Sequence, residues 1–261
     1  MIYFKTYGNS PYRIVLVHGG PGALGSLEPL ALELSKEHGI IEALQTRTSI
    51  MGLLDELLEI VKQNTEGPII LVGHSWGAWL SLIFTSEYPE LIEKLILIGA
   101  GSFDESYSKE ISETRMDRLS RFDQHLFDRL LLQLNNPKNK NKDVTFKRLS
   151  KIIQKADSHK LINTSNDRTV CRFDLFKSIW PEANQMRKSG ELLKDVHKIK
   201  CPVIAIHGDY DPHLWEGVHN PLKQLLDDFQ FHLLEKCGHE PWNEECAREQ
   251  FFQIINQYIC R

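Results

Sequence analysis

The sequence predicts an α/β fold: a doubly wound, mostly parallel sheet of about seven strands, interrupted by a helical cap insertion. Two observations carry this prediction. Short apolar runs, each long enough for a strand that is buried on both faces, alternate with segments of helical periodicity. Residues 101–198 carry helical periodicity alone. A chain of 261 residues, 41% hydrophobic and 25% charged, is long enough for one globular domain with such an insertion.

The first two predicted strands are separated by a turn. Residues 2–7 alternate loosely between apolar and polar and end at the turn Gly8–Pro11, after which residues 13–17 form a buried run. We expect these two strands to pair as a hairpin at one side of the sheet. The second strand leads directly into the glycine-rich segment His18–Gly22.

The rest of the core alternates strands with helices. Further apolar runs predict strands at residues 39–44, 69–72, 95–98, 202–206 and 229–234. Helical spacing predicts helices at residues 27–37, 49–63, 78–84 and 243–259. Ser26 is a candidate N-cap for the first of these helices, and Thr48 or Ser49 for the second. Because strands and helices alternate along the chain, we expect the strands to run parallel.

The middle of the chain differs from the rest in composition. From about Gly101 to Lys198 it is polar, charged and free of strand-like runs. Apolar residues at helical spacing predict one amphipathic helix: Leu119, Phe122, Leu126, Leu130 and Leu134. Further helical stretches are expected near residues 145–156, 171–179 and 182–193. We therefore predict an α/β core of residues 1–100 and 199–261 with a helical cap, residues 101–198, over the carboxyl edge of its sheet.

The turn Gly73–Gly77, with the sequence Gly-His-Ser-Trp-Gly, lies between a buried strand and a predicted helix. Glycines flank Ser75 in this pattern because the backbone turns so sharply that neighbouring side chains would clash. Such a turn lifts the serine hydroxyl above the carboxyl edge of the sheet and aims the next helix N-terminus at it. Ser75 is therefore the candidate nucleophile, and the alternative is an ordinary serine in a tight turn.

A serine hydroxyl needs an adjacent base, and the base needs a carboxylate to orient it. The C-terminal third places a candidate for each role directly after a strand, at the edge where α/β sheets bind their ligands. His239 follows the last predicted strand, and Asp211 follows the strand before it. Asp209 lies on the same loop and is the alternative acid. The order serine, acid, histidine is the one that this type of sheet requires.

These residues resemble the α/β-hydrolase superfamily over nearly the whole chain, the insertion excepted. His18–Gly22 together with Gly73–Gly77 is similar to the proline iminopeptidase-like branch, in which a tryptophan often follows the nucleophile. Two features depart from that branch. The loop after the strand at residues 39–44 is only Gln45–Ser49 long, and the sheet lacks one N-terminal strand of the usual eight.

The resemblance implies a role for each matching position. Ser75 corresponds to the nucleophile, His239 to the base and Asp211 to the acid. The backbone N–H groups of Gly20 and Trp76 correspond to the oxyanion donors, each of which typically contributes about 3–4 kcal/mol to the transition state.

Other side chains near these motifs have two interpretations each. In the peptidase relatives, acidic residues of the insertion bind the free amino terminus of the substrate, and Glu182 is a possible equivalent; a glutamate is also favourable near a helix N-terminus. Trp242 is a candidate pocket residue or a core residue. His18 either holds the oxyanion loop by hydrogen bonds, which we favour, or touches the substrate.

The loop after residues 202–206 also offers a set of possible metal ligands. His207, Asp209, Asp211 and His213 alternate along it. Gly208 and Pro212 mark a turn, however, and a turn breaks the alternation that a shared face would need. We therefore expect no metal site and no cofactor.

The sequence thus predicts a cofactor-independent serine hydrolase that cleaves an ester or amide bond of a small substrate through an acyl-enzyme. Two alternatives stay open. One is a proline iminopeptidase-type aminopeptidase acting on a short peptide, and the other is a non-catalytic hydrolase-fold protein that binds a small ligand.

Composition narrows the partners and the compartment. The formal net charge of −4 argues against nucleic acid and against an anionic membrane as partners, and no apolar run approaches the length of a membrane span. We expect no signal peptide. The five dispersed cysteines, without Cys-x-x-Cys spacing, indicate reduced thiols in a cytoplasmic protein. The sequence makes no prediction of oligomeric state.

Overall fold

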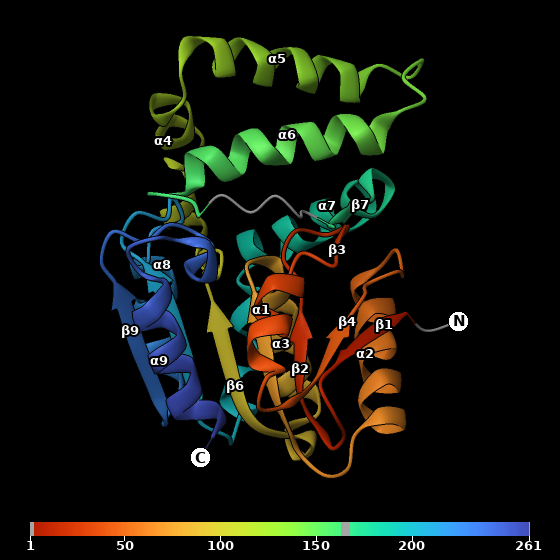
Figure 1. The fold of residues 1–261 in the computed structure, drawn as a ribbon, viewed down its shortest axis with the longest axis vertical. Coiled ribbons are helices and arrows are strands. Elements are labelled where there is room, and N and C mark those ends of the chain that lie inside the picture. Colours follow the sequence, from red (N-terminus) through yellow and green to blue (C-terminus); the bar gives the residue numbers. More distant parts are fainter. Residues whose placement is uncertain (1–2, 163–167, 261) are drawn as a thin grey trace.

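The computed structural model describes residues 3–162 and 168–260 and has a seven-stranded sheet at its centre (Figure 1). The strand order is β1-β4-β2-β5-β6-β8-β9, and every neighbouring pair is parallel except β1 with β4. The strands are β1 (Phe4–Tyr7), β2 (Tyr12–Val17), β4 (Gly39–Ala43), β5 (Ile69–His74), β6 (Ile92–Ile98), β8 (Val203–Gly208) and β9 (Phe229–Leu234). This confirms the predicted fold class.

The predicted hairpin of the first two strands is wrong. β1 pairs antiparallel with β4, and β4 lies between β1 and β2. The physical reason is burial: the last four residues of β2 are buried, so this strand takes a parallel neighbour on each side, β4 and β5. β1 is only partly buried along its length, which suits a strand at the edge of a sheet.

Helices cover both faces of the sheet. The core helices are α1 (Glu28–Leu34), α2 (Ile50–Asn64), α3 (Trp76–Glu87), α8 (Glu216–Leu225) and α9 (Arg248–Ile259). Apolar side chains of α1 and α9 pack in one hydrophobic cluster with one face of the strands, and those of α2, α3 and α8 pack in a second cluster with the opposite face. The arrangement is therefore doubly wound (Figure 1).

The predicted helix caps were right in one case and wrong in the other. Ser49 caps α2, because its Oγ accepts a hydrogen bond from the Gly52 N–H at 3.1 Å. Ser26 does not cap α1: the helix starts one residue later than that would require, at Glu28, with Leu27 in the N-cap position.

Between β6 and β8 lies a segment that we call the helical segment (residues 101–198). Its helices are α4 (Ile111–Arg118), α5 (Arg121–Asn135), α6 (Lys142–Asp157) and α7 (Phe173–Ser189). α5 and α6 pack together through their own apolar cluster and lie above the carboxyl ends of the strands (Figure 1). The face predicted for α5 is correct in its second half, where Leu130 and Leu134 are buried, but Phe122 is 74% exposed.

The helical segment also contains a short strand that the sequence pattern did not predict. β7 (Val170–Cys171) pairs antiparallel with β3 (Ala23–Leu24), which lies in the loop after β2. Two residues are too few to produce a periodic signal. The two helical stretches expected after this strand are one helix, α7, which continues through Pro181.

Short 3₁₀ helices complete the described chain: Pro89–Leu91, Glu105–Ser108, Glu191–Leu193, Val196–Lys198 and Pro241–Asn243. Among the helices in the described ranges, none combines the length and the apolar character needed to cross a bilayer.

Candidate active site

Ser75 lies at the junction of β5 and α3 with an unusual backbone conformation. Its φ is +54° and its ψ is −118°, in a region that residues other than glycine rarely adopt. The turn is held from both sides: the Ser75 N–H donates to the Ile98 carbonyl at 3.0 Å, and a Cβ at Gly77 would collide with the Val17 carbonyl oxygen. The strain at Ser75 is thus imposed by packing against β2 and β6.

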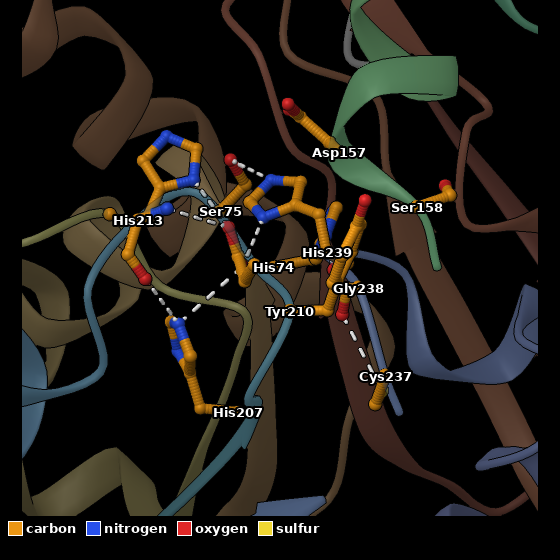
Figure 2. Close-up of polar contacts among 12 residues, drawn as sticks. His74, Ser75, Asp157, Ser158, His207, Tyr210, His213, Cys237, Gly238 and His239 are labelled. Carbon is orange, nitrogen blue, oxygen red and sulfur yellow. Dashed lines mark hydrogen bonds and ion pairs between the residues drawn. The ribbon is translucent and has the colours of Figure 1, made fainter. Parts of the chain in front are cut away.

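Figure 2 shows Ser75 and His239 at the carboxyl edge of the sheet, where three loops meet. Ser75 Oγ lies 2.9 Å from His239 Nε2, and His239 Nδ1 lies 2.6 Å from Asp211 Oδ2. An ionised carboxylate only accepts hydrogen bonds, so His239 donates through Nδ1–H and its Nε2 accepts from the serine hydroxyl. The structure therefore brings the three predicted residues into one chain of hydrogen bonds, in the order that base-assisted attack requires.

The register of the strands explains why these loops meet. Parallel pairing aligns His74 with Ile98 and Ile98 with Ile206, so β5, β6 and β8 end at about the same level. Gly208 in turn pairs with Leu234 of β9. Residues that follow these strands must therefore emerge at one edge of the sheet.

Burial and charge shift the ionisation of the base and the acid in useful directions. Burial alone would lower the pKa of His239, but the charge and hydrogen bond of Asp211 outweigh it, so the pKa is raised above its usual value. Burial alone would raise the pKa of Asp211, yet the surrounding histidines, His239 first among them, hold it well below its usual range. The Asp211 side chain is 0% exposed and stays ionised, and His239 is a stronger base than a free imidazole.

The alternative acid, Asp209, takes a different position. It is exposed, and its Oδ1 accepts a hydrogen bond from the Cys237 N–H at 3.1 Å. Asp209 thus fastens the loop after β8 to the loop that leads to His239. Of the two aspartates, the structure brings Asp211 to the histidine.

Three further histidines surround this pair, and sequence reasoning gave none of them a role beside it. His213 contacts Asp211 Oδ1 twice, through its backbone N–H at 2.9 Å and its Nδ1 at 2.8 Å. His207 Nε2 donates to the His213 carbonyl at 2.7 Å, and His74 Nε2 donates to the His239 carbonyl at 3.1 Å. Burial lowers the pKa of all three rings, so they are neutral supports of the loops. The Asp-Pro-His sequence at residues 211–213 was the available signal.

The segment His18–Gly22 lies directly beside Ser75. A Cβ on Gly19 would be 2.7 Å from His74 Nδ1 and 3.1 Å from Ser75 Cβ, so the loop passes against the serine. His18 holds this loop: its Nδ1–H donates to the Gly19 carbonyl at 2.9 Å, and its Nε2 accepts from the Gln45 N–H at 3.2 Å. Burial lowers the pKa of His18 to about 4. His18 thus forms the hydrogen bonds expected of a residue that holds this loop.

The two predicted oxyanion donors are available for a ligand. Within the described residues, neither the Gly20 N–H nor the Trp76 N–H donates a hydrogen bond to another group of the protein. Trp76 is the first residue of α3, where a helix leaves its N–H groups unsatisfied. Its indole N–H donates to Gln45 Oε1 at 2.9 Å, which ties the residue after the serine to the loop after β4.

The two predicted substrate-binding residues lie outside this group. Glu182 is exposed on α7, and its Oε2 accepts a hydrogen bond from the Ile50 N–H at 3.3 Å, at the start of α2. It thus supports the N-terminus of a neighbouring helix. Trp242 is 1% exposed and packs edge-on against His74, with ring centroids 4.7 Å apart. It fills the core beneath the site.

The helical segment makes contacts to the loops that carry the base and the acid. The His239 N–H donates to the Asp157 carbonyl at 2.9 Å, and the Asp157 carboxylate forms two hydrogen bonds with Arg115, at 2.7 and 2.6 Å. Arg118 donates to the Tyr210 carbonyl at 2.7 Å and lies over the Tyr210 ring. These contacts join residues far apart in the sequence, and no motif announced them.

Two groups of possible metal ligands occur in the part of the chain that the structure describes. One is Asp211, His213 and His239, whose donor atoms lie within 4.8 Å of one another. These atoms are engaged in the hydrogen bonds described above, and Asp209 points away from them. The other group is Glu37, His38 and Cys260, at the opposite edge of the sheet.

Comparison with known families shows to which family the chain belongs. A family model described as serine aminopeptidase, S33, matches residues 47–246, more than half of the sequence. The chain belongs to the serine aminopeptidase S33 family. The S33 assignment places it in the α/β-hydrolase superfamily, as the sequence motifs predicted, and makes the protein a hydrolytic enzyme.

Relatives of this S33-family protein include hydrolases of several kinds. A 2-hydroxy-6-oxo-2,4-heptadienoate hydrolase of Pseudomonas putida is 24% identical over 94% of this chain and 88% of its own length. A 2-hydroxy-6-oxononadienedioate/2-hydroxy-6-oxononatrienedioate hydrolase of Escherichia coli is 24% identical over 100% of this chain and 91% of its own length.

Solved structures share the fold at lower identity. An epoxide hydrolase of Bacillus megaterium superposes with a TM-score of 0.68 at 14% identity, over 100% of this chain and 97% of its own. A monoacylglycerol lipase of Paleococcus ferrophilus superposes with a TM-score of 0.62 at 16% identity, over 99% and 98%. These similarities establish the α/β-hydrolase fold for the S33-family protein.

Proposed function

We propose that this protein is a cofactor-independent serine hydrolase that cleaves an ester or amide bond of a small molecule or short peptide through an acyl-enzyme. The observation that carries the proposal is the hydrogen-bonded chain from Ser75 through His239 to a fully buried Asp211. Each member has the environment its role needs: a strained, presented hydroxyl, a base of raised pKa, and an acid that stays ionised.

In this mechanism Ser75 Oγ attacks the substrate carbonyl carbon while His239 Nε2 takes the hydroxyl proton. Asp211 keeps Nδ1 protonated and stabilises the imidazolium that forms. His239 then gives the proton to the leaving alcohol or amine, and the C–O or C–N bond breaks. Water attacks the acyl-enzyme in the same way, and the acid product leaves with Ser75 restored.

The negative charge of the tetrahedral intermediates needs donors on the side opposite the base. We assign this role to the N–H groups of Gly20 and Trp76, which have no acceptor in the described protein. Gly20 belongs to the loop that passes against Ser75, and Trp76 begins α3 directly after it. Donors of this kind contribute about 3–4 kcal/mol each. The helical segment, residues 101–198, would act as a cap over the core formed by residues 1–100 and 199–261.

The test is Ser75→Ala with an activated ester and a fluorophosphonate probe. We expect turnover of p-nitrophenyl acetate to fall on the order of 10⁵-fold or more, with an unchanged circular dichroism spectrum, because only the nucleophile is lost. The wild-type protein should be labelled by the probe at Ser75 and the variant should not. An unlabelled wild type would contradict the serine mechanism, and retained turnover in the variant would exclude Ser75 as nucleophile.

Two narrower substrate classes are distinguished by the same assay with other substrates. Proline iminopeptidase action needs an acidic group for the substrate amino terminus, and the candidate, Glu182, is bonded to the Ile50 N–H instead. Cleavage of proline-naphthylamide with negligible ester turnover would nevertheless establish it. The relatives that hydrolyse 2-hydroxy-6-oxo dienoates favour a second candidate, cleavage of such a ketone acid. A cation near the site could bind the carboxylate of such a substrate. Arg115 is near enough for its charge to lower the pKa of His239, but it is already paired with the Asp157 carboxylate.

A further inference from the structure

Two histidines bond the acid of the site at short distance, while His207 Nε2 lies farther from Asp211 Oδ2, at 3.5 Å. Asp211 uses Oδ2 for His239 at 2.6 Å and Oδ1 for His213, whose backbone N–H and Nδ1 lie at 2.9 and 2.8 Å. The two imidazole rings are 4.7 Å apart between centroids and inclined by 32°. Figure 2 shows both rings close together near Ser75. The triad of the proposed function uses only one of them.

The bonding of His213 settles which of its nitrogens carries the proton. Its neighbour Asp211 is ionised and can only accept, so His213 donates through Nδ1–H. Burial lowers the pKa of His213 despite the attraction of Asp211, so the ring is neutral and Nε2 keeps its lone pair. No residue in the described part of the chain bonds to that Nε2.

The free nitrogen is also accessible. The His213 side chain is 14% exposed, nearly the same as the 13% of His239, and both belong to loops at the carboxyl edge of the sheet. A neutral, accessible Nε2 on a ring beside that of His239 can accept a hydrogen bond from an O–H or N–H group of a bound molecule. The other buried histidines differ, since His74 and His207 already use Nε2 to hold a backbone carbonyl.

We propose that His213 is a second histidine of the active site with two tasks: its Nδ1–H positions Asp211 for His239, and its Nε2 accepts a hydrogen bond from a donor group on the substrate. This proposal rests on the proposed serine hydrolase function and narrows its substrates. The preferred class is an ester or amide that carries a hydroxyl or N–H group next to the scissile carbonyl. Without such a group the lone pair of His213 Nε2 is desolvated and unmatched in the complex.

Two substitutions separate the tasks. The side-chain amide nitrogen of asparagine lies where Nδ1 of histidine lies, so His213→Asn keeps a donor for Asp211 and loses the acceptor at Nε2. His213→Phe keeps the ring volume and loses both. The control is His125→Phe, because His125 is an exposed histidine on α5 whose ring contacts only the Arg121 carbonyl among the described residues.

The first readout concerns positioning and does not need turnover. We expect the wild type to show two strongly downfield imidazole N–H proton resonances, from the two Nδ1–H groups that donate to Asp211. His213→Asn and His213→Phe should each show one. The rate of fluorophosphonate labelling at Ser75 should fall about tenfold in His213→Phe and be restored several-fold in His213→Asn. Two resonances in His213→Phe, or labelling as fast as in the wild type, would overturn the positioning role.

The second readout compares p-nitrophenyl hydroxyacetate with p-nitrophenyl methoxyacetate, in which a methyl group replaces the hydroxyl proton and so removes the donor. The wild type and His125→Phe should prefer the hydroxyacetate about tenfold in kcat/KM, mainly through KM, and both His213 variants should lose the preference. An equal preference in wild type and His213→Asn would overturn the substrate contact. Failure of the proposed function is separate: it would appear as a wild type that the fluorophosphonate does not label.

Discussion

The loops at the carboxyl edge of the sheet and the helical segment hold their polar side chains in different ways. In the loops, His18 and Asp211 are enclosed and bonded to groups that follow neighbouring strands. The helical segment reaches the site through the arginines of α4 and the Asp157 carbonyl. Two of its backbone N–H groups, those of His159 and Lys160, also donate to the buried Glu244. Strands buried on both faces fix the loops, whereas α5 and α6 are held mainly by packing on each other.

This difference teaches where the chemistry is encoded. Groups in the loops have several partners each and little freedom to relax, so replacing one of them should alter catalysis or folding strongly. Some residues of the helical segment, such as Gly190, have open surroundings. We therefore compare substitutions in pairs, one at an enclosed position and one at an open position. The enclosed position should show the larger loss of activity or stability.

The largest difference is expected between two aspartates of one loop. Asp211→Asn should lower kcat on the order of 10⁴-fold, because an amide can no longer hold the productive tautomer of His239. Asp209→Asn should keep kcat within about threefold, since the Asp209 side chain bonds only the Cys237 N–H among the described residues. Steady-state ester hydrolysis measures both. A comparable loss in the two variants would remove the distinction between catalytic acid and loop support.

The next comparison concerns two glycines. Gly77→Ala places a methyl group against the Val17 and His18 carbonyl oxygens, so the free energy of unfolding should fall by about 4 kcal/mol or the protein should not fold. Gly190, at the end of α7, has φ +77° and nothing near its Cβ position. Gly190→Ala should therefore cost only about 1–2 kcal/mol of conformational strain. Urea unfolding measures the free energy of unfolding of both variants. A larger loss in Gly190→Ala than in Gly77→Ala would contradict the comparison.

The smallest effect is a pH dependence of stability. His18 has a pKa of about 4 in the folded protein against 6.5 for an ordinary histidine, so the unfolded chain binds its proton first as the pH falls. This stabilisation is complete above pH 6.5 and lost towards pH 4, by about 3 kcal/mol. The drop should be smaller in His18→Gln and unchanged in the exposed control His125→Gln. Unfolding curves at pH 7, 5.5 and 4.5 measure it, and an identical drop in His18→Gln would assign it to other groups.

Much of the fold could be predicted because its signals are local. The apolar run of β9 has the bounds expected from the sequence, Phe229–Leu234, and Ser49 caps α2 as its position suggested. The partner of β1 could not be predicted from its own residues, since pairing with β4 depends on which strands leave β2 an open side. β7 is too short for any periodic signal.

The site divides in the same way. The Gly-His-Ser-Trp-Gly turn predicted a serine in a strained backbone conformation, and Ser75 has φ +54°. The resemblance already assigned the acid to Asp211 rather than Asp209, and in the structure Asp211 is the aspartate that bonds His239. The bond of Asp209 to the Cys237 N–H, more than twenty residues away, was beyond a sequence pattern. The contact between Arg115 and Asp157 is long-range, so composition and spacing carried no trace of it. The only signal for His213 was its place two residues after the acid Asp211.

The separation of Ser75 and His239 along the chain has a consequence for how the enzyme is made. The two residues are 164 positions apart and meet only after β6, β8 and β9 have added to the sheet in parallel, through long-range pairings that form slowly. A partly assembled chain therefore carries a serine without its base and is chemically silent. After denaturation, activity should consequently return later than the helical circular dichroism signal. The return of activity therefore marks the moment at which the sheet is complete.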